Sequence, residues 1–193
     1  MIFSINNYIE QHNIVMSCLD VKEIESAISL IMDKLVKGKR IAVCGNGGSA
    51  LAASHYITDW NKMVNLKTGR RFNGICLSDN VGIITAYAND LSYANIYSKQ
   101  VENLLLPDDL LITISGSGKS QNVVRATEVA NEMEVTTLAI CGYDGGDLKK
   151  ISKQSVWIKS YEMQLCEDAH VMFGHIVMKS LCGSDIEVKS SGG

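Results

Sequence analysis

Proline, aromatic residues and an excess of charge of one sign are all scarce in this chain of 193 residues. Pro107 is the only proline, aromatic residues make up 6%, and 18 Lys and Arg stand against 21 Asp and Glu, for a formal net charge of -3. This near balance excludes a polycation that binds nucleic acid and an acidic disordered tail. With one proline and 16 glycines, the special turns depend on glycine.

Targeting signals and cysteine motifs are also missing. The first residues, MIFSINNYIEQHN, lack the basic start and apolar run of a signal peptide, and no apolar run is long enough to span a bilayer. Six cysteines lie far apart with no CxxC pair, which argues against a disulfide scaffold and a four-cysteine zinc site. We therefore expect a reduced, cytoplasmic protein with no membrane partner. A single domain over 1–193 is predicted, with helices in 1–38, an α/β core in 39–184 and a solvated tail in 185–193.

The N-terminal segment has the apolar spacing of helices. From Val21 to Leu35 the apolar residues recur on one helical face. Asp20 and Glu23 have the spacing of a capping box, and Gly38 is suited to end the helix. The spacing leaves open whether this segment covers the chain's own sheet or a neighbouring subunit.

After Arg40 the pattern changes to short apolar runs, each closed by glycine or serine. The runs lie at 41–44, 74–77, 110–114, 136–141 and 156–158. Stretches with helical spacing lie at 49–62, 80–104, 120–133, 146–152 and 162–182. Continuous apolar runs indicate strands buried on both faces, as in a parallel sheet. The alternation predicts a three-layer α/β sandwich with a five-stranded parallel sheet, whose ligand would bind at the carboxyl ends of the strands.

A glycine-rich loop, GNGGSA at 45–50, follows the first predicted strand. It matches the dinucleotide pattern G-x-G-x-x-[GA], and a helix is predicted to follow. The acidic residue that ends the second predicted strand is Asp79, well beyond the distance of about 20 residues that a dinucleotide site requires. Two interpretations stay open: a tight turn that needs small residues, and a ligand loop in which Asn46 and Ser49 supply polar groups.

A second loop, SGSGKS at 115–120, follows the third predicted strand. Its GKS resembles the end of a nucleotide phosphate loop, but the opening glycine of that motif would fall at Thr113. The three serines at a helix N-terminus would suit one phosphate group, or they only cap the helix. Two such loops favour a monophosphate with a polar body, such as a polyol phosphate, over a dinucleotide.

Two pairs of ionisable residues stand at informative spacings. His55 and Asp59, at i and i+4, lie about 6 Å apart along a helix, which suits a shared metal or a simple surface pair. Glu167 and His175 are eight residues apart, roughly 12 Å along a helix, so one metal or one sugar carbon is not easily reached by both. If both are functional, they should serve different copies of the site, one of them across a subunit interface. On spacing alone, the interpretation of His170 and His175 as packing histidines is favoured.

Together these motifs resemble the sugar isomerase (SIS) family, and within it the phosphoheptose isomerases. The resemblance runs from about residue 35 to 182. It rests on GNGGSA…SH (45–55), SDN…A-ND…Y (78–93), ISGSGKSQNV (114–123), GYDGGDL (142–148) and EDAH…GH (167–175). It implies a flavodoxin-like sheet preceded by N-terminal helices, and a homotetramer with active sites at subunit interfaces.

The resemblance also implies roles for individual residues. The substrate-binding positions are Asn46, Gly47, Ser49, Asp90, Ser115, Gly116, Ser117 and Ser120. Gly116 stands where the family usually has threonine, so one hydroxyl contact is missing. His55 matches a zinc ligand, and His175 matches the catalytic histidine, which is also a ligand in zinc-bound members.

Two acidic residues depart from the family pattern. Asp59 stands where a catalytic glutamate is usual, and its shorter side chain withdraws the carboxylate by roughly 1.5 Å. Glu167 replaces a glutamine and adds a carboxylate, a good ligand for zinc. We expect one zinc per subunit, held by His55, Asp59, Glu167 and His175, with Asp59 or Glu167 as the catalytic base.

The implied reaction converts sedoheptulose 7-phosphate into D-glycero-D-manno-heptose 7-phosphate through an enediol, for the heptose of bacterial lipopolysaccharide or capsule. A carboxylate would remove the proton beside the carbonyl, His175 would manage the oxygen protons, and zinc would polarise the oxygens. Two alternatives stay open. One is a tetrameric SIS protein that binds the replication initiator, and the other is an isomerase of a different sugar phosphate.

Overall fold

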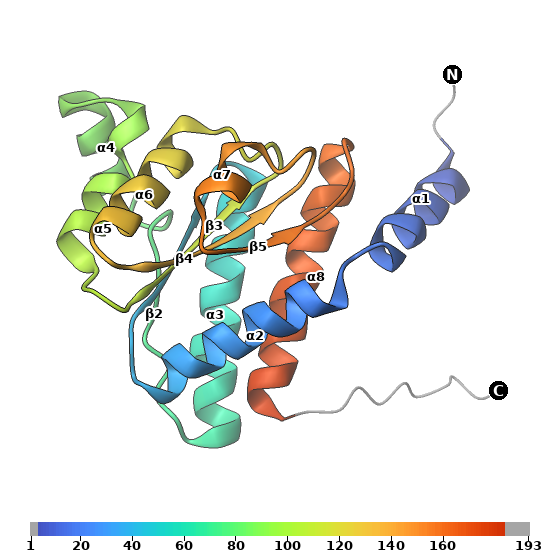
Figure 1. Ribbon diagram of the computed structural model, residues 1–193, viewed down its shortest axis with the longest axis horizontal. Coiled ribbons are helices and arrows are strands. Elements are labelled where there is room, and N and C mark those ends of the chain that lie inside the picture. Colours follow the sequence, from blue (N-terminus) through green and yellow to red (C-terminus); the bar gives the residue numbers. More distant parts are fainter. Residues whose placement is uncertain (1–3, 184–193) are drawn as a thin grey trace.

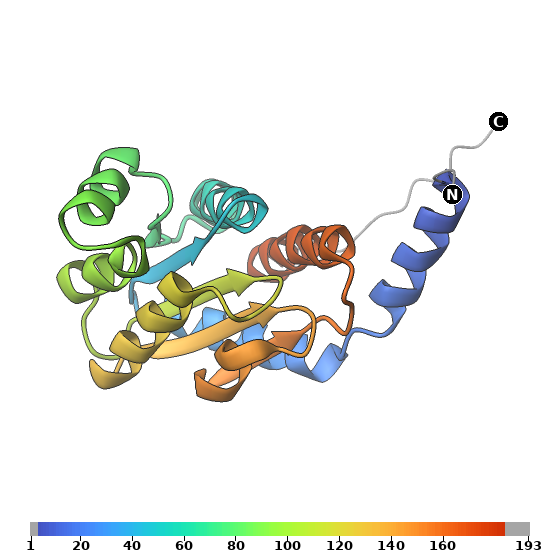
Figure 2. The same ribbon diagram turned by 90° about the horizontal axis from the view of Figure 1, so that it is seen from above.

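A five-stranded parallel sheet forms the centre of the molecule. The computed structural model describes residues 4–183, so the tail expected at 185–193 lies outside it (Figures 1 and 2). The strands are β1 (Ile41–Gly45), β2 (Gly74–Cys76), β3 (Leu110–Ser115), β4 (Thr136–Cys141) and β5 (Gln154–Trp157). Their order is β2-β1-β3-β4-β5, and all neighbouring pairs are parallel. The predicted sheet is confirmed, and the order is that of a flavodoxin-like fold.

Helices lie on both sides of this sheet, and all but α1 lie close to its body. They are α1 (Ile5–Ser17), α2 (Val21–Val36), α3 (Gly48–Thr68), α4 (Val81–Asp90), α5 (Ser98–Leu104), α6 (Gln121–Glu132), α7 (Gly146–Ile151) and α8 (Met163–Cys182). One core joins α2, α3 and α8 to side chains such as Ile112, and a second joins α5, α6 and α7 to the opposite face through Leu111. Figure 2 shows α3 and α8 on one side of the sheet and α6 and α7 on the other. No helix in residues 4–183 has the length and apolar content to cross a membrane.

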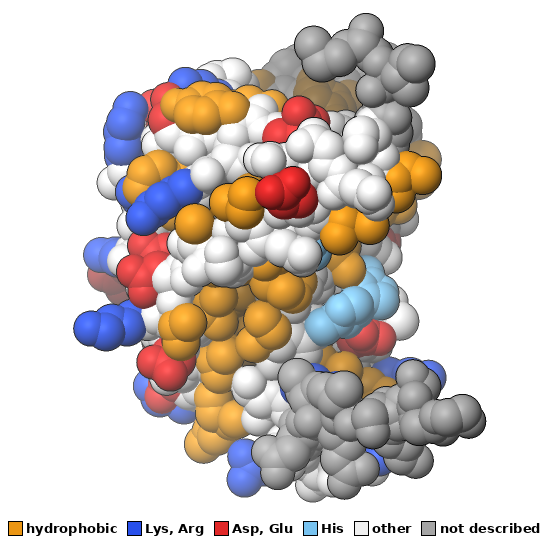
Figure 3. Space-filling view, turned by 90° about the vertical axis from the view of Figure 1, so that its right-hand side faces the viewer, with side chains coloured by type: hydrophobic (Ala, Val, Ile, Leu, Met, Phe, Trp, Pro, Cys, Tyr) orange, Lys and Arg blue, Asp and Glu red, His pale blue; other side chains and the backbone are white. Residues whose placement is uncertain are grey.

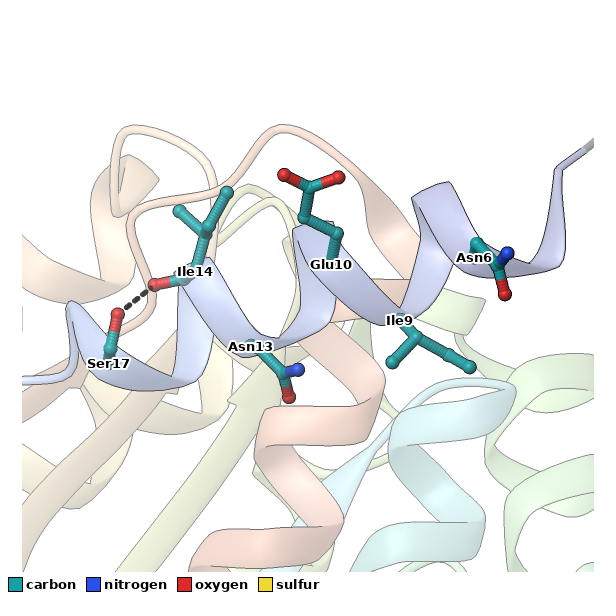
Figure 4. Close-up of a pocket in the computed structure, with 6 residues that line it drawn as sticks. All are labelled: Asn6, Ile9, Glu10, Asn13, Ile14 and Ser17. Carbon is teal, nitrogen blue, oxygen red and sulfur yellow. Dashed lines mark hydrogen bonds between the residues drawn. The ribbon is translucent and has the colours of Figure 1, made fainter.

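Helix α1 stands away from the body of the molecule (Figures 1 and 2), and none of its residues is buried. The Tyr8 hydroxyl donates to Asp168 Oδ2 of α8 at 2.7 Å, and this carboxylate raises the pKa of Tyr8 to about 12. A shallow pocket along α1 is lined by α1 side chains alone, as Figure 4 shows, and holds none of the predicted site residues.

Residues 80–104 do not form one helix, so this prediction is wrong. After α4, Ser92 is extended, with φ -170° and ψ 163°, and a short 3₁₀ turn (Tyr93–Asn95) precedes α5. The break turns Tyr93 toward Asn46, whose Oδ1 accepts from the tyrosine hydroxyl at 3.0 Å, and Tyr97 toward the carbonyl of Gly45. The two tyrosine hydroxyls therefore bond to the end of β1 and the residue after it, and the helix does not continue through this segment.

The start of α2 differs in one detail from the sequence prediction. Asp20 is the N-cap residue and accepts from the Lys22 amide at 2.9 Å, as expected of a cap. The capping box is wrong, because Glu23 Oε2 accepts from the Trp157 amide at 2.9 Å and so ties α2 to the end of β5. Gly38, with φ +67°, follows the helix as predicted.

Candidate active site

The two glycine-rich loops meet at the carboxyl ends of β1 and β3. These strands are neighbours in the sheet, with Gly45 paired to Ile114. The chain leaves them toward helices on opposite faces, which opens a crevice at this point of the sheet. A cavity of about 260 Å³ there is lined by predicted substrate-binding residues, namely Asn46, Gly47, Ser49, Ser115, Gly116, Ser117 and Ser120. Met163 and Glu167 of α8 also line this cavity. Asp90, the remaining predicted substrate-binding residue, is not among the described residues that line it.

The loop at 115–120, called the serine loop below, is stabilised by hydrogen bonds to its own serine hydroxyls. Ser115 Oγ accepts from the Gly118 amide at 3.2 Å, and Ser117 Oγ accepts from the Lys119 amide at 3.3 Å. Ser120 is the N-cap residue of α6, yet its hydroxyl caps no backbone amide among the described residues. Its Oγ lies 3.4 Å from Ser115 Oγ instead. The N-terminus of α6 is therefore left with donors that suit an anion.

The segment GYDGGDL (142–148) packs against the backbone of the serine loop. The amides of Asp147 and Leu148 donate to the Gly118 carbonyl at 3.0 and 3.1 Å. The backbones approach so closely that a Cβ on Gly146 would lie 2.5 Å from the Gly118 carbonyl carbon. Lys119 forms an exposed ion pair with Asp144 at 2.9 Å. This lysine is thus paired outside the cavity, unlike the lysine of a nucleotide phosphate loop.

Asn46 is held by two residues that sequence reasoning did not place in the site. Asn122, on the first turn of α6, exchanges two hydrogen bonds with the Asn46 amide, at 2.9 and 2.8 Å. Tyr93 adds the third, described above. A signal was available, because both residues belong to the motifs that carry the family resemblance. Their spacing alone gave no reason to bring them to the first loop.

A cluster of His55, Asp59 and His175 lies between α3 and α8. The Nε2 atoms of the two histidines are 2.8 Å apart, and Asp59 Oδ2 lies 3.5 Å from His55 Nε2 and 4.0 Å from His175 Nε2. Helical spacing puts His55 and Asp59 on one face of α3, as predicted. Gly174 brings α8 close, because a Cβ there would lie 2.2 Å from the Tyr56 ring.

These three side chains fit a zinc ion. Tetrahedral zinc with bonds of 2.0–2.1 Å separates its donor atoms by about 3.3 Å, a value within the range of the three distances above. The side chains of His55, Asp59 and His175 are 43%, 26% and 49% exposed, so a further ligand has access to the cluster. Figure 3 shows exposed histidine side chains beside an apolar area on this side of the molecule.

Glu167 lies outside this donor cluster. Its carboxylate packs over Gly48, where an added Cβ would lie 2.3 Å from Oε1. The same side chain lines the loop cavity and a second cavity of about 460 Å³ that reaches His55. Within one chain, three of the four expected metal ligands are therefore grouped, and the fourth stands between them and the serine loop.

His170 and His175 differ in environment although they share α8. His170 is fully buried, and neither ring nitrogen has a hydrogen-bond partner in the described structure. Burial lowers the pKa of His170 to about 4, so the ring is neutral near pH 7. His170 is thus a packing residue, whereas His175 belongs to the cluster.

Similar proteins share both the sequence and the fold. Residues 7–142 match the family model described as SIS domain. The chain is 33% identical over 171 residues to the phosphoheptose isomerase of Clostridium acetobutylicum, which covers 86% of this chain and 87% of that protein. It is 33% identical over 154 residues to the enzyme of the same name from Helicobacter pylori, with 80% of each chain covered.

Solved structures agree with these matches. A phosphoheptose isomerase from Francisella tularensis superimposes with a TM-score of 0.84 at 28% identity, over 93% of this chain and 97% of that one. A phosphoheptose isomerase from Neisseria gonorrhoeae also gives 0.84, at 26% identity, over 92% and 94% of the two chains.

Proposed function

The chain belongs to the SIS domain family and is an isomerase of the phosphoheptose isomerase type, and from this membership we propose that it converts sedoheptulose 7-phosphate into D-glycero-D-manno-heptose 7-phosphate. The observation that carries the proposal is a cavity made by two loops rich in serine and glycine. It shares Glu167 with a second cavity that reaches the His-Asp-His cluster. A phosphate site next to ionisable groups is what isomerisation of a sugar phosphate needs.

The serine loop is assigned to the phosphate. Ser115, Ser117 and Ser120 bring hydroxyls to the N-terminus of α6, where backbone amides and the helix dipole favour a dianion. Asn46 and Ser49, with the backbone of Gly47, are assigned to sugar hydroxyls. Asp90, three residues before Tyr93 in the chain, is assigned to a further sugar hydroxyl on the family resemblance, although it does not line the cavity.

The proton transfers are assigned to α3 and α8. A carboxylate takes a proton from C1 of the ketose to give the enediol, and the proton returns to C2 to give the aldose, while His175 moves a proton between O1 and O2. Glu167 is the favoured base because it lines the loop cavity, whereas Asp59 lies among the metal donors. Zinc held by His55, Asp59 and His175 would supply a Lewis acid that polarises the substrate oxygens.

The working unit is proposed to be a cytoplasmic homotetramer in which residues 1–193 of each chain form one SIS domain. Helix α1 supports this assembly, because it leaves Ile5 and Ile9 exposed and buries none of its own residues. The separation of Glu167 from the cluster also supports sites completed at subunit interfaces. The heptose product would serve lipopolysaccharide or capsule.

A second candidate is an isomerase of a different sugar phosphate. The observation behind it is Met163, whose Sδ lies 2.4 Å from where a Cβ on Gly116 would be. The thioether thus occupies space beside the serine loop that a threonine side chain would take in relatives with that residue. A changed wall of this kind alters which sugar is accepted.

The test is direct. Protein loaded with zinc is incubated with sedoheptulose 7-phosphate, and NMR follows the anomeric signals of the aldose product. Ribose 5-phosphate and fructose 6-phosphate are the comparison substrates. Turnover of the heptose phosphate supports the proposal, and turnover of only a comparison substrate transfers the assignment to the second candidate.

A further inference from the structure

The Asn46 side chain lies in a closed arrangement of hydrogen bonds. Asn46 Nδ2 donates to Asn122 Oδ1 at 2.9 Å, and Asn122 Nδ2 donates to Asn46 Oδ1 at 2.8 Å. The Tyr93 hydroxyl lies 3.0 Å from the same Asn46 Oδ1. Asn122 is only 2% exposed, so its amide has little access to water as an alternative partner.

A backbone amide fixes the direction of this arrangement. The Val123 N–H, which can only donate, lies 3.0 Å from Asn122 Oδ1 and 3.0 Å from the Ser120 carbonyl oxygen, so an NH₂ group in place of Oδ1 would face another donor. The Asn122 oxygen must therefore face Val123, and its NH₂ group must face Asn46. The acceptor for the Asn122 NH₂ group is then the Asn46 oxygen. Rotating either side-chain amide by 180° would place two donors or two acceptors against each other.

The remaining hydrogen-bonding capacity of Asn46 follows from that direction. Its oxygen accepts from Asn122 and Tyr93, which uses both lone pairs. Its NH₂ group donates one hydrogen to Asn122 Oδ1, and no residue among 4–183 accepts the second hydrogen. Since Asn46 lines the loop cavity, the group it has left for a ligand is a single N–H donor.

We propose that Asn122 and Tyr93 are positioning residues that hold Asn46 as a donor toward an oxygen of the bound sugar phosphate. The ligand atom is thereby restricted to an acceptor: a carbonyl, hydroxyl or phosphate oxygen. This inference rests on the proposed function for the nature of the ligand, but not for the arrangement itself. It also gives a role to the break before Tyr93, which directs the tyrosine to β1.

A mutant cycle separates positioning from simple stabilisation. Tyr93→Phe and Asn122→Ala are each expected to lower kcat/KM by about 5- to 10-fold, the value of one or two neutral hydrogen bonds. In an Asn46→Ala background, each change is expected to alter kcat/KM by less than about 2-fold, because the residue through which both act is gone. Asn131→Ala and Tyr161→Phe are the matched controls. Asn131 lies on α6 as Asn122 does but bonds to the Ile151 carbonyl and Thr137, and Tyr161 is an exposed tyrosine that stacks on Tyr143.

The outcomes divide cleanly. Unchanged kcat/KM in the single variants, or full effects that persist in the Asn46→Ala background, would overturn the inference. The cycle is run on whichever sugar phosphate the wild-type protein turns over, so failure with sedoheptulose 7-phosphate counts against the proposed function alone. A ligand-free check uses ¹⁵N-labelled protein: Tyr93→Phe should shift the side-chain NH₂ signals of Asn46 and Asn122, and unshifted signals would also overturn it.

Discussion

The Nε2 atoms of His55 and His175 lie 2.8 Å apart, although 120 residues separate the two histidines in the chain. Two neutral imidazoles can share one hydrogen at this distance, but two lone pairs that converge beside a carboxylate are also a cation site. The contact depends on the close packing of α3 against α8, which Tyr56 and Trp60 stabilise from within the core. The site is thus built on two helices whose separation is set by core residues.

The first prediction concerns the metal. His55→Ala and His175→Ala should each reduce bound zinc from about one per subunit to near zero, because two protein donors hold zinc far more weakly than three. Elemental analysis after gel filtration measures the stoichiometry. His12→Ala, on α1 and not a member of the cluster, is the control. Zinc retained by both cluster variants would remove the metal site from the proposal.

The second prediction concerns the packing that brings the histidines together. Gly174→Ala places a Cβ 2.2 Å from Tyr56, a fully buried ring that has no room to withdraw. We expect a loss of about 1–3 kcal/mol in the free energy of unfolding and weaker zinc binding. Urea denaturation with and without zinc measures both.

Gly82→Ala provides the control for that variant. Gly82 lies in helix α4, and the nearest atom to its Cβ would be Asn80 Oδ1 at 3.3 Å. Alanine in an exposed helix is favoured over glycine by roughly 1 kcal/mol, so this variant should be as stable as the wild type or more so. Equal destabilisation by both substitutions would show that the α3–α8 contact is not the cause.

The sequence was sufficient to predict the sheet, its parallel strands and the meeting of the two loops. Buried strands are continuous apolar runs, and adjacent parallel strands end at one edge, so the positions of Asn46 and Ser115 followed from local patterns. Local patterns did not predict the pairing of His55 with His175, and only the family resemblance placed both histidines in one metal site. The pairing has a physical origin that local patterns do not carry. It depends on how α3 and α8 cross, and that depends on Gly174 against Tyr56, a contact with no local signature.

The same limit explains the interrupted helix. Residues 80–104 have helical apolar spacing, yet Tyr93 and Tyr97 bond to the loop and strand end at Asn46 and Gly45. Long-range hydrogen bonds of this kind override local propensity, and a single sequence does not reveal them. Local patterns did not predict the position of Asn122 for the same reason, since its partner Asn46 is 76 residues away in the chain.

The third prediction concerns the support of the serine loop. Gly146→Ala would bring a Cβ within 2.5 Å of the Gly118 backbone and 2.6 Å of the Ser117 carbonyl oxygen. Because the clash is with backbone atoms and not with a flexible side chain, only a displacement of the serine loop itself can relieve it. We expect KM for the sugar phosphate to rise about 10-fold with a smaller change in kcat. Steady-state kinetics, together with calorimetry of the same ligand, measures the effect.

Gly145→Ala separates loop displacement from backbone strain. Both glycines have positive φ, +84° at Gly145 and +55° at Gly146, so each alanine costs about 1–2 kcal/mol of stability. The Cβ at Gly145, however, would meet the flexible Lys149 side chain at 2.5 Å rather than the loop. A similar rise in KM for both variants would contradict a specific role for the Gly146–Gly118 approach.

The fourth prediction concerns the response of stability to acid. The pKa of His170 falls from 6.5 to about 4 on folding because the ring is buried, so between these values the unfolded chain binds a proton that the folded chain does not. The contribution of His170 to the free energy of unfolding is therefore fully present above pH 6.5 and is lost as the pH falls toward 4, a change of roughly 3 kcal/mol. His170→Phe removes this group and should flatten the pH dependence, while stability at pH 7.5 stays equal or rises because two unpartnered buried nitrogens are lost.

Urea denaturation between pH 4.5 and 7.5 in the presence of a chelator measures this dependence, since removal of metal keeps zinc release from His55 and His175 out of the comparison. His12→Gln, a change on α1 that leaves His170 in place, should keep the wild-type slope. A slope that is the same in His170→Phe and the wild type would mean that the buried ring takes up its proton in the folded state. In that case an acceptor reaches one of its nitrogens, and the packing role assigned to His170 would be wrong.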